Sequence, residues 1–369
     1  MKKIIVVGGG LAGLVAAVQL ARAGMSCVLI EKKVYPFHRV CGEYISNEAV
    51  PFLKANDLFP AEFEPPAITR FTLSSASGRS STMALDLGGF GISRFTFDHF
   101  LFKKVLAAGV EVLQGEEVQD VFFGDNRFQV KTDKRMLIGD IVVGAFGKRS
   151  RLDHFLKRRF ISERSPYVGV KYHVRTNHPA DLIALHNFEG GYCGMSNIED
   201  GKTTLCYLTH RDHLKKFRNI SHMEEQVMYK NPLLQKVFAE AEFLFDKPEV
   251  INEVSFRTKS CVEDHVLMAG DSAGMIAPLC GNGMAMAIHG AKLLSDVVTQ
   301  FAKGQITRAQ LEEAYTREWN KNFRSRLWRG RQIQKLFGSY WASHVAVSLA
   351  VNVRPVALGI MRSTHGDPF

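Results

Sequence analysis

Residues 3–31 constrain the fold of this chain more than any other stretch. A β-branched apolar run, Lys3–Val7, has the length of a buried strand, and residues 11–23 keep apolar side chains at helical spacing until a glycine ends the pattern. Residues 25–31 then predict a second strand. Strand, glycine turn, helix and strand in this order predict a dinucleotide-binding unit.

The glycine turn has the spacing of a phosphate-binding loop. Gly8, Gly10 and Gly13 form GxGxxG, which permits a tight turn, close approach of a pyrophosphate and packing of the helix on the strand. The free N–H groups at the helix start make an anion site. Glu31 follows about 20 residues later, where an acidic side chain accepts hydrogen bonds from a ribose hydroxyl. We therefore favour a bound cofactor over a glycine turn without a ligand.

A second glycine-rich signature lies near residue 270. An apolar strand starting at Val266 ends in Gly270-Asp271, and Gly281 and Gly283 open the helix that follows. An acid at a strand end can accept from sugar or ribityl hydroxyls, and the two later glycines leave N–H groups free to face an electron-rich ring. Two such signatures indicate one long ligand, and flavin adenine dinucleotide (FAD) has that length.

The loop of residues 32–46 directly follows the nucleotide-binding unit, so we expect it to reach over the cofactor. Cys41, near Arg39, could be partly ionised and therefore redox-active or nucleophilic; a small packing residue is the alternative. Arg94, before a predicted helix, could pair with a cofactor phosphate, and Asp98 could orient it; a surface salt bridge is the alternative.

The predicted fold class is α/β, with a Rossmann-like FAD-binding domain, an inserted β-sheet substrate domain and a C-terminal helical segment. Residues 65–87 predict a hairpin in a separate sheet, and residues 136–143 predict the last strand of a β-meander. The predicted domains are residues 1–64, 88–155 and 255–300 for FAD, residues 65–87 and 156–254 for the substrate, and residues 301–369 for the helical region.

Length and composition fit a folded protein of two domains. The chain has 369 residues, 46% of them hydrophobic, and a net charge of +10. It enters its first strand at once, without a signal-peptide pattern, so we expect a cytoplasmic and at most membrane-peripheral protein. Six cysteines are scattered without metal-ligand spacing, which predicts free thiols and no metal site.

Positive charge concentrates near the C-terminus. Residues 317–335 carry seven basic side chains and one acid. We expect residues 317–341 to meet an anionic membrane surface or an acidic carrier protein; a solvated helix face is the alternative. No nucleic-acid motif accompanies the charge, so nucleic acid is not expected as a partner. No apolar run is long enough to span a membrane.

Together these motifs resemble the three flavin motifs of the hydroxybenzoate-hydroxylase-like flavoprotein superfamily. The first is GxGxxG, the second is residues 140–151, and the third is Gly270-Asp271 with the glycines after it. The sequence Cys41-Gly42-Glu43 resembles the CGE loop of the geranylgeranyl reductase family, whose relatives include monooxygenases and halogenases. The resemblance covers roughly residues 1–300.

The resemblance also implies which residues contact FAD. The pyrophosphate lies at the first glycine turn, the ribose at Glu31, the isoalloxazine beside Cys41 and Gly42, and the ribityl and pyrimidine side near Asp271. If the chain is a reductase, we expect Cys41 to be the proton donor or flavin-side partner, and we hypothesise that Cys280 approaches it as a redox pair. The predicted FAD-binding residues are Gly8, Gly10, Leu11, Ala12, Gly13, Glu31, Lys32, Arg39, Cys41, Gly42, Arg94, Val118, Gly270, Asp271, Gly281, Gly283 and Met284.

The sequence departs from the family patterns at two places. Phe146 stands where the middle motif usually has Asp, so the electron donor stays open between NAD(P)H and a separate reductase or ferredoxin. The stretch Tyr192-Cys-Gly-Met matches neither the Tyr-x-Trp-x-Phe-Pro stretch of the reductases nor the Trp-x-Trp stretch of the halogenases. The exact substrate therefore does not follow from the resemblance.

Three functions are compatible with these observations. In the first, reduced FAD delivers hydride from flavin N5 to a C=C bond of a hydrophobic isoprenoid, polyene or acyl substrate. In the second, a monooxygenase or halogenase-related enzyme acts through a flavin C4a-hydroperoxide. In the third, the chain is a non-catalytic lipid escort protein. Fold alone does not choose among them.

Overall fold

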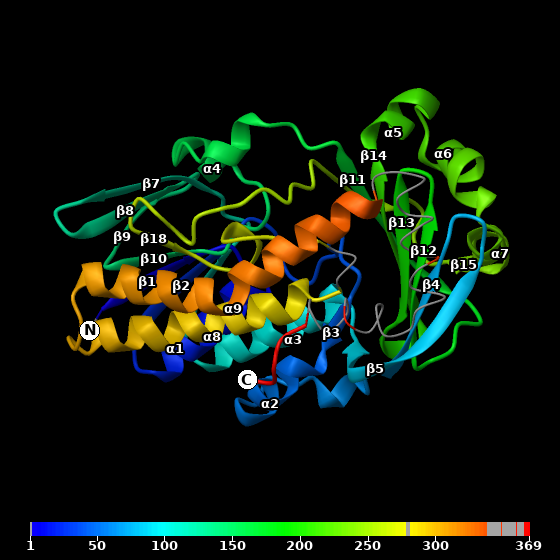
Figure 1. The fold of residues 1–369 in the computed structure, drawn as a ribbon. Helices are drawn as coiled ribbons and strands as arrows, with labels where there is room; N and C mark the ends of the chain where they lie inside the picture. Colours follow the sequence, from blue (N-terminus) through cyan, green and yellow to red (C-terminus); the bar gives the residue numbers. More distant parts are fainter. Residues whose placement is uncertain (1, 278–280, 338–347, 349–358, 360–364) are drawn as a thin grey trace.

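The computed structural model describes residues 2–277, 281–337, 348, 359 and 365–369. In these residues the chain forms two large sheets, one small sheet and flanking helices (Figure 1). The first large sheet has the strand order β17-β18-β10-β1-β2-β6, and every pair in it is parallel except β17 with β18. Its strands are β1 (Lys3–Val7), β2 (Ser26–Glu31), β6 (Glu111–Gln114), β10 (Ile141–Gly144), β17 (Val262–Glu263) and β18 (Val266–Met268). This arrangement confirms the predicted α/β, Rossmann-like class.

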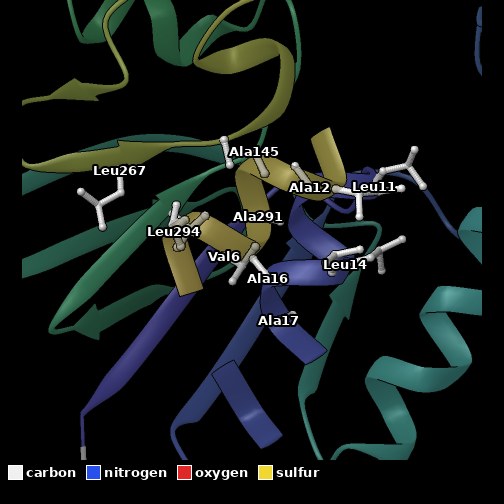
Figure 2. Close-up of a cluster of buried hydrophobic side chains, with 14 of the residues drawn as sticks. Val6, Leu11, Ala12, Leu14, Ala16, Ala17, Ala145, Leu267, Ala291 and Leu294 are labelled. Atoms are coloured by element: carbon white, nitrogen blue, oxygen red, sulfur yellow. The ribbon is translucent and has the colours of Figure 1, made fainter. Parts of the chain in front are cut away.

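Small side chains let the helices beside this sheet pack closely. Helices α1 (Leu11–Arg22), α3 (Arg94–Ala107) and α8 (Gly283–Ala302) pack through α1, which contacts both others (Figure 1). Alanines on both sides of the α1 and α8 contact are fully buried, so the two helix axes can approach one another. Figure 2 shows this core, whose labelled members are Val6, Leu11, Ala12, Leu14, Ala16, Ala17, Ala145, Leu267, Ala291 and Leu294.

The expected single strand over residues 136–143 is wrong, because the chain divides at Asp140. Residues before it form β9 (Met136–Gly139), which joins β7 (Val118–Gly124) and β8 (Arg127–Thr132) in the small sheet. Residues after it form β10 in the first sheet. The Asp140 carboxylate accepts the N–H of Lys3 at 2.8 Å, and the Asp140 N–H donates to the Lys3 carbonyl at 2.8 Å. These two bonds start the pairing of β10 with β1.

The second large sheet carries the predicted hairpin. Its strand order is β15-β11-β14-β13-β12-β4-β5-β3, and β16 also pairs with β11. The hairpin strands β4 and β5 pair with one another and not with the first sheet, as predicted. The strands are β3 (Tyr44–Ser46), β4 (Ala67–Ser74), β5 (Ser80–Gly91), β11 (Tyr167–Arg175), β12 (Leu182–Phe188), β13 (Gly191–Asn197), β14 (Thr203–His210), β15 (Glu242–Phe243) and β16 (Glu249–Asn252).

The two faces of this sheet pack against different parts of the molecule. Three helices cover one face, where a buried cluster includes Val170, Tyr207 and Met223 (Figure 1). These helices are α5 (Arg211–Phe217), α6 (Ile220–Val227) and α7 (Pro232–Glu240). The opposite face carries Leu185 and Leu208, which share a second apolar cluster with residues that follow β18. Strand alternation separates the two sets, since neighbouring side chains point to opposite faces.

The C-terminal region begins with one continuous helix, α9 (Arg308–Phe337), within the residues predicted as a helical region. Its inner side buries Tyr315, Trp319 and Phe323 against α8 (Figure 1). The remaining helices are α2 (Val50–Ala55), α4 (Arg151–Phe155) and the 3-10 turns Asn47–Ala49, Ala61–Phe63, Arg159–Ser162, Glu199–Gly201, Met228–Lys230 and Gly270–Ser272. Within the described ranges, none of the helices has the length and apolar character needed to cross a bilayer.

Candidate functional site

The first glycine turn closes tightly between β1 and α1. Gly8 has φ of +102° and donates its N–H to the carbonyl of Ile30 at 2.8 Å. A Cβ atom at Gly8 would overlap the carbonyl of Ala145, and one at Gly13 would overlap the carbonyl of Gly8. Only glycine at these two positions lets α1 start directly against the end of the sheet.

The start of α1 is open to an anion. Gly10 is its N-cap and supplies no side-chain hydrogen bond, so the first N–H groups of α1 lack a side-chain cap. A Cβ atom built on Gly10 would meet only Nη2 of Arg94, at 3.7 Å. Leu11 and Ala12 form the first turn and face the core. The donors and the facing guanidinium fit an FAD pyrophosphate.

Glu31 lies beside this turn, at the end of β2. Its carboxylate accepts the N–H of Gly9 at 2.8 Å, the N–H of Lys33 at 3.0 Å and Nη2 of Arg39 at 3.1 Å. The side chain is buried, so it holds a fixed place next to the N-terminus of α1. Lys32, in contrast, points outward and pairs with Glu117 at 3.9 Å.

Asp98 holds two arginines at the same place. It is 1% exposed and accepts from Nε of Arg94 at 2.7 Å, from Nη2 of Arg94 at 2.8 Å and from Nε of Arg39 at 3.1 Å. Arg39 also donates to the carbonyl of Gly9 at 3.2 Å. The expectation that Asp98 orients Arg94 therefore agrees with the geometry, and the alternative of a surface salt bridge does not.

The structure brings the second glycine signature to the first. Gly270 has φ of +60°, and a Cβ atom on it would lie 3.0 Å from Cβ of Ala12. Gly283 and Met284 form the start of α8, while Gly281 lies near Tyr44. Residues far apart in the chain thus meet at the N-termini of α1 and α8, as one long ligand requires.

The segment after β10 is tied to this second signature. Gly147 donates its N–H to Oγ of Ser272 at 2.9 Å. Nζ of Lys259 donates to the carbonyl of Lys148 at 2.7 Å and to that of Asp271 at 2.8 Å. Burial lowers the pKa of Lys148, while the carboxylate of Asp271 raises it. The Lys148 side chain is therefore close to the predicted ribityl-binding acid.

Cys41 does not have the environment expected of an ionised thiol. The Arg39 guanidinium beside it in the sequence contacts Asp98 and Glu31 instead. Burial raises the pKa of the Cys41 thiol, and the Arg94 guanidinium lowers it only in part. The thiol therefore stays protonated at neutral pH, which suits a proton donor better than a nucleophile.

Val118 and Cys280 are also among the residues predicted for the site. Val118 begins β7 and is buried in the core, two residues after Glu116, whose N–H donates to the carbonyl of Glu31 at 3.3 Å. Cys280 lies outside the described residues, so its pairing with Cys41 stays a prediction. The five cysteines in the described part of the chain are free thiols.

Residues missed by the sequence analysis complete the site. Tyr35 donates its hydroxyl to the carbonyl of Gly9. Glu43, the last residue of the CGE loop, contacts Lys171 and His173 on β11. Tyr35 is an aromatic residue in a loop, where no regular spacing marks it as functional. The partners of Glu43 are about 130 residues away in sequence, so no local pattern predicts these contacts.

A cluster of apolar side chains, here called the apolar wall, lies on the face of the second sheet opposite α5, α6 and α7. Val254, Met275 and Ile333 reach it from segments outside that sheet. On the sheet itself the wall is made by Leu73, Met83, Leu185, Tyr192 and Leu208. Met275 follows the second glycine signature by only a few residues, so the wall adjoins the predicted cofactor site.

Comparisons with known proteins agree with this geometry. The model of the FAD binding domain family FAD_binding_2 matches residues 3–37. A tryptophan 2-halogenase of Chondromyces crocatus is 22% identical over 352 residues, covering 87% of this chain and 65% of the halogenase. A digeranylgeranylglycerophospholipid reductase of Methanosarcina mazei is 24% identical over 336 residues, covering 86% of this chain and 80% of the reductase.

A solved structure shares the whole architecture. A geranylgeranyl bacteriochlorophyll reductase-like protein from Thermoplasma acidophilum superposes with a TM-score of 0.78 at 17% identity, covering 98% of this chain and 95% of that one. The match establishes the fold. The family model confirms the predicted FAD cofactor, and the reductase and halogenase relatives agree with the resemblance to geranylgeranyl reductase-like flavoproteins. The chain spans less than two thirds of the length of the halogenase relative.

Proposed function

We propose that this chain is an FAD-dependent reductase of C=C bonds in a hydrophobic isoprenoid, polyene or acyl substrate. The observation that supports this most is the apolar wall that adjoins the cofactor site. Leu185, Leu208 and Met275 offer it no charge and few polar atoms. Leu185 and Leu208 are buried, so a substrate held beside them would lie in an apolar environment that disfavours charged or polar groups.

The protein's own contribution is orientation, exclusion of water and a proton. Bound reduced flavin would supply the electrons for the reduction. The wall would exclude water from the substrate, and Arg39 and Arg94, both bonded to Asp98, would hold the cofactor phosphates. The Cys41 thiol, protonated at neutral pH, is the candidate donor to the substrate carbon.

The test is an anaerobic reaction of the reduced, FAD-loaded protein with a polyprenol such as geranylgeraniol. A reductase reoxidises its flavin only when the polyprenol is added, and the product gains hydrogen across a C=C bond. Saturated alcohol of the same length is the control. Flavin reoxidation at the same rate with and without the polyprenol would contradict the proposal.

A monooxygenase or halogenase is the second candidate, supported by similarity to a tryptophan 2-halogenase. It predicts no anaerobic turnover. With labelled O₂, a monooxygenase product carries the label; with bromide present, a halogenase product carries bromine. A protein that takes up no FAD would instead favour the lipid escort. The same reaction run with NAD(P)H, or with ferredoxin and its reductase, identifies the electron donor.

We further propose that the outer face of α9 contacts an anionic membrane surface, from which a lipid substrate would enter. Arg317, Lys321, Arg324 and Trp328 are exposed and recur at helical spacing. Cosedimentation with phosphatidylcholine vesicles, with and without phosphatidylserine, tests it. Charge reversal of the three basic residues should abolish binding to the vesicles that contain phosphatidylserine. Equal binding with and without phosphatidylserine would contradict the membrane proposal, and an acidic carrier protein would then be the alternative partner.

A further inference from the structure

Glu43 is a fully buried carboxylate with three partners. Its Oε1 accepts the N–H of Arg94 at 2.8 Å and lies 2.5 Å from Nζ of Lys171. Its Oε2 lies 2.6 Å from Nε2 of His173. The residue has φ of +55°, an uncommon backbone conformation for glutamate, so the surrounding contacts hold it in place.

These contacts join three elements at one point. Lys171 and His173 are on β11 of the second sheet, and Arg94 begins α3. Nζ of Lys171 also donates to the carbonyl of Arg39 at 3.1 Å. The loop that carries Cys41 is therefore bonded to the second sheet on both sides of that cysteine.

Glu43 and Lys171 are two buried groups of opposite charge. Lys171 is 0% exposed and His173 is 3% exposed, so neither reaches bulk water. Burial raises the pKa of Glu43, but the Lys171 ammonium and His173 outweigh it and hold the pKa at about 2. A buried charge that loses its partner is strongly unfavourable. Glu43 and Lys171 are therefore a mutually dependent ion pair.

The cluster lies next to free space. A Cβ atom built on Gly42 would meet nothing within 4 Å, so the chain leaves room beside the residue before Glu43. The resemblance places the isoalloxazine beside Cys41 and Gly42. Burial is the main reason that the pKa of the Cys41 thiol is raised; the Glu43 carboxylate raises this pKa further and the Lys171 ammonium lowers it, so both charges act at this spot.

We propose that Glu43, Lys171 and His173 form a buried charge cluster that holds the Cys41–Gly42 segment against the second sheet and sets the charge felt by bound flavin. Glu43 is a positioning residue in this assignment and contacts no substrate. The inference rests on FAD binding in the proposed function, but on none of the candidate reactions.

Glu199 offers a matched control. It is also a buried glutamate, in the 3-10 turn Glu199–Gly201, and it contacts the start of α3 by accepting from the N–H of Ser93 at 2.8 Å and from the hydroxyl of Thr96 at 2.7 Å. Its lysine partner, Lys202, is 3.7 Å away and partly exposed. Glu199→Gln removes a buried carboxylate from the same helix start without unbalancing the Lys171 charge.

The first test is the midpoint potential of bound FAD. Reduction adds negative charge to the flavin, so Glu43→Gln, which leaves the Lys171 ammonium unbalanced, should raise the potential. Lys171→Gln should lower it, and the double variant should return it close to the wild-type value. Glu199→Gln should leave it unchanged. The charge assignment would be overturned if Glu43→Gln and Lys171→Gln shifted the potential in the same direction. It would also be overturned if neither variant shifted the potential more than Glu199→Gln does.

The second test needs no flavin. Hydrogen exchange of residues 40–43 should accelerate at least tenfold in Glu43→Gln and much less in Glu199→Gln. Equal exchange in both variants would overturn the positioning role. A wild-type protein that takes up no FAD would refute the proposed function and the charge assignment, while exchange would still decide the positioning role. FAD uptake without C=C reduction would refute only the proposed reaction.

Discussion

The carboxylate of Glu31 accepts the backbone N–H of Gly9 at 2.8 Å, so the acid at the end of β2 is bonded to the glycine turn itself. The predicted ribose-binding acid and the predicted phosphate-binding turn are thereby joined by a direct hydrogen bond. Removing the carboxylate should disturb both of them at once.

Glu31→Ala should weaken FAD binding roughly 10- to 100-fold, because hydrogen bonds to a charged group contribute about 1.5–3 kcal/mol. Fluorescence titration of the apoprotein with FAD measures the dissociation constant. Glu117→Ala, which removes an exposed acid that pairs with Lys32, is the control and should leave the constant unchanged. An unchanged constant in Glu31→Ala would show that this carboxylate does not support the cofactor.

The Cys41 thiol should react slowly. Burial raises its pKa, so the thiolate fraction near pH 8 is small. Alkylation by iodoacetamide, followed by mass spectrometry of the Cys41 peptide, should be more than roughly tenfold slower in the native protein than in urea. The rate should rise with pH beyond the range of an ordinary thiol. Fast alkylation at neutral pH would restore the hypothesis of an ionised, nucleophilic cysteine.

Local patterns predicted the parts of the site that form within a short stretch of chain. The glycine turn, Glu31 and the pair Arg94 and Asp98 depend on residues close in sequence, and their physics is the same in any strand-turn-helix unit. The two glycine signatures also meet in the structure, where a Cβ atom on Gly270 would lie 3.0 Å from Cβ of Ala12; the single ligand that would bridge them stays a prediction.

Long-range contacts do not follow from such patterns. The division of residues 136–143 at Asp140 depends on hydrogen bonds to Lys3, which lies 137 residues earlier in the sequence. Likewise, Glu43 is visible in the sequence as part of the CGE motif, but the pairing of its carboxylate with Lys171 depends on how the loop packs on the second sheet. A hydrophobic pattern states which residues are buried and not which partner each one meets.

Stability should fall as pH rises because of Glu224. Burial raises the pKa of Glu224 from 4.5 to about 7, although the hydroxyls of Tyr172 and Tyr207 donate to it. The folded state therefore holds a proton that the unfolded state has released, so stability decreases between about pH 4.5 and pH 7. The loss attributable to this carboxyl is about 3 kcal/mol, because a tenfold difference in proton affinity between the two states corresponds to about 1.4 kcal/mol.

Urea unfolding at several pH values measures this dependence. In Glu224→Gln the decrease between pH 4.5 and pH 7 should be smaller by that amount, since the amide keeps both tyrosine partners and does not ionise. Glu225→Gln, which changes the exposed glutamate next to it, is the control. An identical pH profile in Glu224→Gln and the wild type would contradict a protonated Glu224.

The ion pair between Glu48 and Arg326 should be a main support of the C-terminal region. Glu48 is fully buried, and its Oε1 lies 3.0 Å from Nη2 of Arg326 on α9. The N–H of Gly366 donates to the same carboxylate, and the N–H of Phe369 donates to the Glu48 carbonyl at 3.2 Å. One residue near the CGE loop thus bonds two segments more than 270 residues away.

Arg326→Met should lower the free energy of unfolding by about 3–5 kcal/mol, because it leaves the Glu48 carboxylate buried without its cation. Asp57→Asn, which breaks an exposed pair with Lys104, should cost less than about 1 kcal/mol and is the control. The double variant Glu48→Gln with Arg326→Met should recover part of the loss, since it removes the unpaired charge. A double variant no more stable than Arg326→Met would mean that lost packing of the arginine, and not the unpaired carboxylate, causes the destabilisation.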